Sequence, residues 1–341
     1  MSQAAAAFKR AEEEKWSRAG ERRWQLFKRL EKDNATANFF LKNEAIFPGA
    51  KVLELACGSG ETTLQVAAKV RGYSIPSGQT TGEVVDKLLE MLHPSQNSVK
   101  PISQGATGSV VGVDIAKGML NIFQNRLENT VLKEHVKLVE SDIEEYVMPK
   151  EHFDVVISQY SIPHFPNAVE VLKNVRQSLV PNTGKFVTVI WGPVPQCDIF
   201  SIPKKFLGDP HGHHHHHHHH HHDEQQHHHH HHEHENAHHN DNASVHCHCG
   251  SPQHTLKQIE TAGFHFTTME FPVVYDFASA SDYLYCLSEM NQGMKEYMGE
   301  PGSEKWRQVE SYVKENNSIQ LPDGSLGIRL NNIAIGIVAE P

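Results

Sequence analysis

The sequence predicts an α/β fold in which helices cover both faces of a mostly parallel sheet. Between residues 51 and 191, short apolar runs alternate with amphipathic segments of helical length, the pattern of parallel strands joined by right-handed helical crossovers. The runs VVGV, VVIS and FVTVI are apolar throughout, as strands buried between two helical layers are. No segment recurs at a fixed period, which argues against a solenoid.

The individual elements follow from periodicity and from turn residues. Apolar runs predict strands at 51–55, 109–113, 136–139, 153–158, 185–191, 264–274 and 332–338. Helical spacing of apolar residues predicts helices at 62–70, 117–127, 168–179, 255–262, 281–297 and 304–316. The Asp323-Gly324 pair predicts a turn before the last strand.

Composition divides the chain into a lid and one main domain. Residues 1–45 are helical and charged in pattern and are expected to form an N-terminal lid, whereas residues 46–341 form the main domain. A Gly-, Ser- and Pro-rich insertion covers residues 71–108 and holds one amphipathic helix near 83–92. The helical segment at 275–320 is expected on the substrate side, where it and the lid would exclude water.

Residues 211–249 form a histidine-rich, low-complexity loop. It holds 22 of the 28 histidines in the chain. Imidazole binds zinc, nickel and copper, so the loop is expected to bind such metals adventitiously. Because its histidines have no regular spacing, we expect a disordered surface loop and no specific metal site, although a functional metal store stays open as an alternative.

Charge and cysteine content exclude several classes of protein. The 31 Lys and Arg residues are outnumbered by 41 Asp and Glu residues, for a net charge of −10, which argues against a nucleic-acid-binding scaffold. No apolar run is long enough to span a bilayer, and the N-terminal residues lack the apolar core of a secretion signal. We therefore expect a cytoplasmic protein without membrane or nucleic-acid partners, with its five cysteines reduced.

Carboxylates and a glycine turn mark one edge of the predicted sheet. Glu54 lies near the end of the first strand, and Gly58 and Gly60 follow it, which lets a ligand approach the backbone closely. Asp114 and Asp142 end the next two strands. A carboxylate such as Asp114 can accept hydrogen bonds from both hydroxyls of a ribose. The three acids therefore predict a nucleoside site at the strand ends.

The glycine turn also allows a nicotinamide-dependent oxidoreductase as an alternative. In dinucleotide-binding folds the turn reads G-x-G-x-x-G, with an acid about 20 residues further on. Here Thr63 stands at the third glycine position, and Asp114 follows Gly58 by 56 residues. The pattern of that class is therefore poorly matched.

Five motifs in order resemble the class I S-adenosylmethionine-dependent methyltransferases, in particular the small-molecule branch of ubiquinone and menaquinone methyltransferases. The motifs are VLELACGSGETTLQVA, VVGVDIAKGML, VKLVESDIEEY, FDVVISQYSIPHFPN and LVPNTGKFVTVIWGP. The likeness covers roughly residues 51–193 and 255–271. It implies a Rossmann-like, seven-stranded, mostly parallel sheet with an antiparallel last strand, and S-adenosyl-L-methionine as the cofactor.

The resemblance also implies cofactor contacts. Glu54 would face the methionine ammonium, and Gly58 and Gly60 would pass beneath the cofactor, with Ala56 replacing the first glycine of the motif. Asp114 would hold the ribose hydroxyls. The remaining implied contacts are Ile115 and Met119 with adenine, Asp142 and the Ile143 N–H with the polar edge of adenine, and Ser158 and Gln159 beside the sulfonium.

Two residues beyond the fourth strand are candidates for catalysis. His164 lies where an acceptor would approach, and the ordinary pKa of a histidine suits a base near neutral pH. The alternative is that His164 shapes the pocket or caps the next helix. Tyr160 is likewise either substrate-facing or packed.

The sequence thus favours a methyltransferase acting on a small-molecule acceptor. A non-catalytic cofactor- or metal-binding protein on the same fold is the alternative of another class. Neither the acceptor, the methylated element nor the oligomeric state follows from the sequence. Aromatic and Met residues near the last helices would suit an apolar or ring-bearing acceptor, and a helical core stripe explains them equally: Tyr283, Tyr285, Met290, Met294 and Tyr297.

Overall fold

The computed structural model describes residues 3–96, 100–103, 105–208 and 249–341, apart from the side chains of residues 18–26. Of the histidine-rich loop expected at 211–249, all but Cys249 lies outside the described residues. The division of the chain into an N-terminal lid and a main domain stays a prediction.

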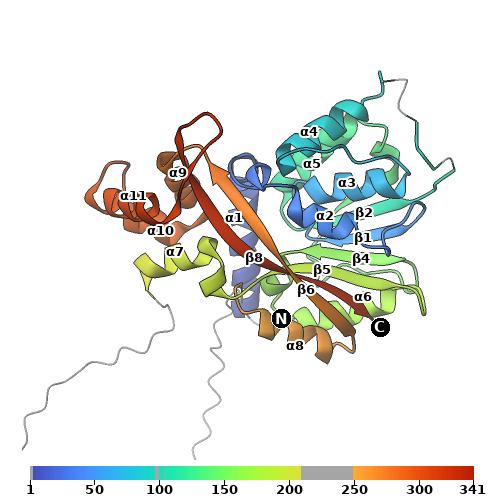
Figure 1. Cartoon of the computed structure of the whole chain (residues 1–341). Helices are drawn as coiled ribbons and strands as arrows, with labels where there is room; N and C mark the ends of the chain where they lie inside the picture. Colours follow the sequence, from blue (N-terminus) through green and yellow to red (C-terminus); the bar gives the residue numbers. More distant parts are fainter. Residues whose placement is uncertain (1–2, 97–99, 104, 209–248) are drawn as a thin grey trace, which may run out of the picture.

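The sheet confirms the predicted fold class (Figure 1). Its strands follow the order β3-β2-β1-β4-β5-β8-β6, and β8 runs antiparallel to both of its neighbours in this order while the first five strands are mutually parallel. The strands of this path are β1 (Lys51–Leu55), β2 (Ser109–Asp114), β3 (Val136–Glu140), β4 (Val155–Gln159), β5 (Lys185–Trp191), β6 (His265–Phe277) and β8 (Leu326–Glu340).

The last two long strands extend past the parallel part of the sheet. β6 and β8 pair along thirteen residues of β6, from His265 to Phe277. The short strand β7 (Ser318–Gln320), which the sequence did not predict, pairs only with β8. In Figure 1 the paired strands β6 and β8 reach from the sheet to a separate group of helices.

Helices cover both faces of the sheet because alternate residues of each strand point to opposite sides. On one face Val52 packs with the helices α3 (Glu61–Val70) and α5 (Lys117–Glu128). On the other face Leu53 packs with α6 (Ala168–Ser178) and α8 (Pro252–Thr261). The two clusters together form the buried core.

A third group of helices gathers beside the sheet, where β6 and β8 extend (Figure 1). One of its members, α7, was not predicted, because Pro203 lies inside it and proline usually ends a helix. The group comprises α1 (Gln3–Leu26), α7 (Asp198–Leu207), α9 (Ala280–Met290), α10 (Gln292–Met298) and α11 (Glu304–Asn317).

The predicted insertion forms a helix that packs against the N-terminal segment. α4 (Thr81–Met91) begins where the Thr80 hydroxyl accepts a hydrogen bond from the Glu83 N–H, and its neighbour η1 (Lys28–Leu30) is a short 3-10 helix. The other short elements are α2 (Ala35–Leu41), η2 (Lys133–His135), η3 (Ile162–His164) and η4 (Val194–Gln196). Across the described ranges, the helices are all too short or too polar to cross a membrane.

Candidate active site

The turn after β1 is shaped by three residues with positive φ. Ala56, Gly58 and Gly60 have φ angles of 54°, 57° and 86°, and α3 begins directly after them. A left-handed conformation costs a residue with a β-carbon about 1–2 kcal/mol, so Ala56 stands where glycine would be unstrained. A β-carbon on Gly60 would lie 2.4 Å from the Phe123 ring. The turn therefore has a conformation that glycine favours, and at Gly60 no room for a side chain.

This turn borders a cavity of about 500 Å³. One half of the cavity lies at the carboxyl ends of β1, β2, β3 and β4, which are adjacent in the sheet. The other half is lined by helices α1 and α9 and by the segments around η1, η3 and α7. We call these the strand-end half and the helical half.

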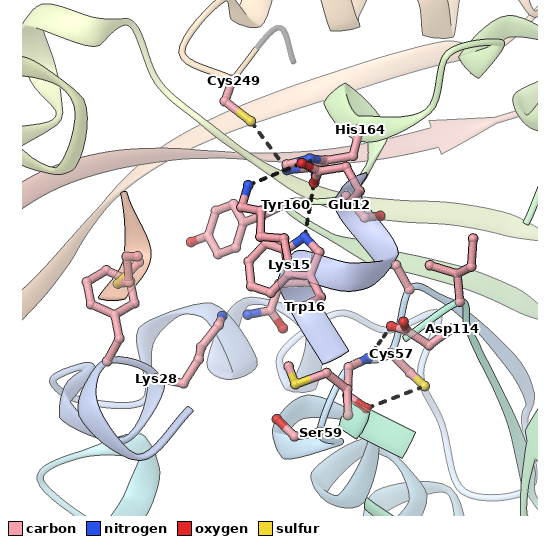
Figure 2. A pocket seen from close by; sticks show the side chains of 18 of the residues that line it. Glu12, Lys15, Trp16, Lys28, Cys57, Ser59, Asp114, Tyr160, His164 and Cys249 are labelled. Carbon is pink, nitrogen blue, oxygen red and sulfur yellow. Dashed lines mark hydrogen bonds and ion pairs between the residues drawn. The ribbon is translucent and has the colours of Figure 1, made fainter. Parts of the chain in front are cut away.

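Glu54 and Asp114 line the strand-end half and are both buried. Burial raises the pKa of Glu54 to about 8, although its carboxylate accepts a hydrogen bond of 2.5 Å from the Thr63 hydroxyl. Burial also raises the pKa of Asp114, while the N–H groups of Gly58 and Ala116 donate to it at 2.7 and 2.8 Å. The turn and the second strand are thus held together by one carboxylate (Figure 2).

Asp142 lines the same half, with an ion-pair partner that the sequence did not reveal. The Lys9 ammonium of α1 lies 2.6 Å from Asp142 and 2.7 Å from Glu144. Both acids raise the pKa of Lys9 against the opposing effect of its burial. α1 approaches closely because a β-carbon on Gly118 would lie 2.4 Å from the Ser17 carbonyl oxygen. The N-terminal helix therefore closes over the strand ends.

The other residues expected to contact a cofactor are mostly at the cavity wall. Gln159 lines it and accepts a hydrogen bond from the Thr62 hydroxyl at 2.5 Å. Ser158 is buried behind the wall, where its hydroxyl contacts that of Ser161, and Gly60 lies outside the lining. The remaining expected residues all line the cavity: Ala56, Gly58, Ile115, Met119 and Ile143.

The helical half has largely apolar walls. The Tyr160 and Trp191 rings stack there with their centroids 4.0 Å apart. Of the aromatic and Met residues expected near the acceptor, Tyr283 and Met290 line the cavity, whereas Tyr285, Met294 and Tyr297 do not. The other apolar residues of this half are Phe27, Ile199, Phe200, Leu287 and Leu330. Such walls suit a flat apolar ligand.

His164 lies in the helical half and is held by two residues that are distant from it in sequence, Glu12 and Cys249 (Figure 2). Its Nδ1 is 2.9 Å from a carboxylate oxygen of Glu12, and its Nε2 is 3.4 Å from the Cys249 sulfur. The Trp16 ring meets the imidazole edge-on at 6.3 Å between centroids. The helix α1 thus contributes directly to the position of His164.

Glu12 carries a full negative charge at neutral pH. Its burial opposes ionisation, but the hydrogen bond with His164 and the contacts of Lys15 and Trp16 outweigh burial and lower the pKa of Glu12 to about 2. Glu12 and Lys9 do not stand out in the sequence, because they belong to an ordinary charged helix. A weak signal existed in the spacing of Lys9, Glu12 and Trp16, which lie three and four residues apart and so share one helix face.

Tyr160 has a left-handed backbone, with φ 56°, and its hydroxyl lies 2.9 Å from the Thr36 hydroxyl. Burial raises the pKa of Tyr160 well above its ordinary value. The phenol therefore stays protonated, so that it forms part of the wall and cannot readily act as a base.

The cysteines differ from the expectation of five reduced thiols. Cys249 is disulfide-bonded, whereas Cys57, Cys197 and Cys286 are free and buried. Pairing depends on spatial proximity, which cysteine count and spacing did not reveal. Within the ranges that the structure describes, no group of three or more His, Cys, Asp or Glu residues could hold a metal ion.

Known proteins resemble part of the chain. The family described as "Methyltransferase domain" matches residues 94–182. A ubiquinone/menaquinone biosynthesis C-methyltransferase of Ectopseudomonas mendocina is 24% identical over 143 residues, covering 42% of this chain and 43% of that protein. A demethylmenaquinone methyltransferase of Staphylococcus aureus is 24% identical over 160 residues, covering 47% of this chain and 50% of that protein. The chain thus spans about half the length of these curated relatives.

Solved structures add a distant likeness. The YcgJ protein of Bacillus subtilis is 13% identical, with a TM-score of 0.48 over 89% of this chain and 96% of that one. The strand order, the glycine turn and these matches make the chain similar to class I S-adenosylmethionine-dependent methyltransferases, in particular to the ubiquinone and menaquinone methyltransferases.

Proposed function

We propose that this chain transfers a methyl group from S-adenosylmethionine to a small, ring-bearing acceptor. The observation that carries the proposal is one cavity with two unlike halves, in which buried carboxylates face apolar and aromatic walls. Its volume of about 500 Å³ falls within the range of small-molecule sites. A cofactor at the strand ends and an acceptor among the helices would share this cavity.

The residues present fit an adenosyl cofactor. Asp114 can accept both ribose hydroxyls, because each of its oxygens keeps a lone pair beyond the one used by a backbone N–H. The Glu54 carboxyl can meet the cofactor's ammonium, and Met119 lies beside Gly58, with its methyl carbon 3.5 Å from the position of a β-carbon there. Asp142 would share its carboxylate between Lys9 and the adenine amino group.

The chemistry that the cofactor supplies is an electrophilic methyl group on a positively charged sulfur. The chain must then hold the acceptor in line, exclude water and accept a proton where the acceptor loses one. We assign the proton to His164, with Glu12 holding Nδ1 so that Nε2 is the reactive nitrogen. The neutral Tyr160 and Trp191 would form the platform for the acceptor ring.

The relatives support a ring-bearing acceptor, since their names describe methylation in ubiquinone and menaquinone biosynthesis. We extend that chemistry to this chain as a class, a flat ring with an apolar body. We propose that the acceptors are small molecules of the cytoplasm.

Calorimetry and label transfer test the proposal. S-adenosylhomocysteine is expected to bind the full chain with one site. Incubation of the protein with methyl-labelled S-adenosylmethionine and a fractionated metabolite extract is expected to label an apolar ring compound. A protein that binds neither S-adenosylmethionine nor its demethylated product would refute the proposed function.

A further inference from the structure

Lys28 lines the cavity and has a buried ammonium without a hydrogen-bond partner among the described residues. It stands at the start of η1. The ammonium lies 4.9 Å from the centroid of the Tyr160 ring, in a cation–π contact. Figure 2 shows the side chain reaching toward the interior of the cavity.

The other two lysines of the described lining are accounted for. Lys9 is paired with Asp142 and Glu144, and Lys15 is 3.2 Å from Glu12. Lys28 therefore differs from them in having no carboxylate partner among the described residues.

Burial of an unpaired ammonium is unfavourable, because protein groups must replace the hydrogen bonds of water. A cation–π contact offsets part of that cost but uses none of the three N–H donors as a hydrogen bond. The charge of Lys28 lowers the pKa of Glu54 against the effect of burial, but the two side chains share no hydrogen bond among the described residues. The donors of Lys28 are thus left unused by the described residues, at the wall of the cavity.

We propose that Lys28 binds an anionic oxygen, a carboxylate or phenolate, where the strand-end and helical halves of the cavity meet. Two sources could supply it: the amino-acid carboxylate of the cofactor, or an acidic group on the acceptor ring. Both sources rest on the proposed function, but anion binding by Lys28 can be measured independently of methyl transfer. In this role Lys28 favours anionic ligands over uncharged ones.

Two pairs of probes, each an anion and its uncharged counterpart, separate the sources. The first pair is S-adenosylhomocysteine and its decarboxylated analogue. The second pair is naphthoate and naphthamide, which share a ring but differ in charge. Affinities are measured by calorimetry with the full chain and with K28M, which keeps the side-chain length and removes the charge.

Two variants control the comparison. K28R retains a cation at the same position. K15M removes another cation that lines the cavity, one that already has Glu12 as its ion-pair partner. Thermal unfolding of each variant checks that a loss of binding is not a loss of folding.

We expect K28M to lower the affinity for one of the two anions by about 10-fold or more, as the loss of a charge-assisted hydrogen bond would. The affinity for the uncharged counterpart should stay the same. Loss for S-adenosylhomocysteine assigns the anion to the cofactor, and loss for naphthoate assigns it to the acceptor. K28R is expected to retain most of the affinity for that anion. K15M is expected to prefer the anion over its uncharged counterpart as strongly as the unaltered protein does. If neither anion loses affinity relative to its counterpart, or if neither anion binds, the role of Lys28 is refuted. If no adenosyl compound binds while naphthoate still depends on Lys28, the proposed function fails and the anion site stands.

Discussion

The two halves of the cavity are constructed differently. In the strand-end half, side chains follow directly from strands that are adjacent in the sheet, and Glu54, Asp114 and Asp142 are held by short hydrogen bonds or ion pairs. In the helical half, residues from η1, η3, α1 and α9 meet across long distances in sequence. The proposed cofactor site thus depends on local backbone geometry, whereas the proposed acceptor site depends on how distant helices pack.

The largest expected effect tests the rigidity of the turn in the strand-end half. Gly60→Ala places a β-carbon 2.4 Å from Phe123 at φ 86°, and we expect it to cost about 2–5 kcal/mol of unfolding free energy. Gly49→Ala is the matched control, since Gly49 also has a positive φ, of 104°, but nothing lies within 4 Å of the added carbon. Urea denaturation measures both. Equal losses would show that the turn can relax.

Glu54→Gln is expected to lower the affinity for S-adenosylhomocysteine by about 10- to 100-fold, because a neutral amide replaces the carboxylate that would pair with the ligand's ammonium. Calorimetry measures the affinity. Glu140→Gln, which changes an exposed acid at the end of β3, serves as the control and should bind like the unaltered protein. Unchanged affinity in Glu54→Gln would remove Glu54 from the site.

The raised pKa of Glu54 predicts that binding of the cofactor releases a proton. With a pKa of about 8 in the free protein, Glu54 is mostly protonated at pH 7, and an arriving ammonium favours its carboxylate. Affinity should therefore rise with pH up to about 8 and then level off, with about one proton released per ligand at pH 7. Calorimetry of S-adenosylhomocysteine in two buffers of different ionisation enthalpy counts the protons. Glu54→Gln should abolish the release, and a pH-independent affinity of the unaltered protein would contradict this expectation.

The smallest of these effects tests the helical half. Glu12→Gln should lower kcat by ~10-fold, because His164 loses the carboxylate that orients Nδ1. The affinity for S-adenosylhomocysteine and the KM for the cofactor should stay the same, since Glu12 touches none of the three strand-end acids. Glu13→Gln changes an exposed neighbour on α1 and controls for helix charge. A parallel loss of cofactor affinity would mean that the two halves are not separable.

The strand-end half could be predicted in detail because its signals are local. The run from Val52 to Gly60 carries a buried strand, an acid and a glycine turn within nine residues, and β1 has the predicted bounds. Parallel strands place their carboxyl ends on one edge of the sheet, so the positions of Asp114 and Asp142 beside Glu54 could be predicted from the strand arrangement alone. Ser158 and Gly60 were the exceptions, since neither lines the cavity. For Ser158 the reason is that the direction of one side chain depends on neighbours such as Ser161.

The sequence by itself thus determined the α/β sheet, the turn and the acids at the strand ends, because hydrophobic period and glycine placement act over a few residues. Three-dimensional packing is what brings Lys9 to Asp142 across 133 positions and Glu12 to His164, and what buries the Lys28 Nζ atom without a hydrogen-bond partner among the described residues. The physical reason is that these contacts depend on where α1 and η1 pack. An amphipathic charged helix specifies which of its faces is apolar but not the surface against which it will lie.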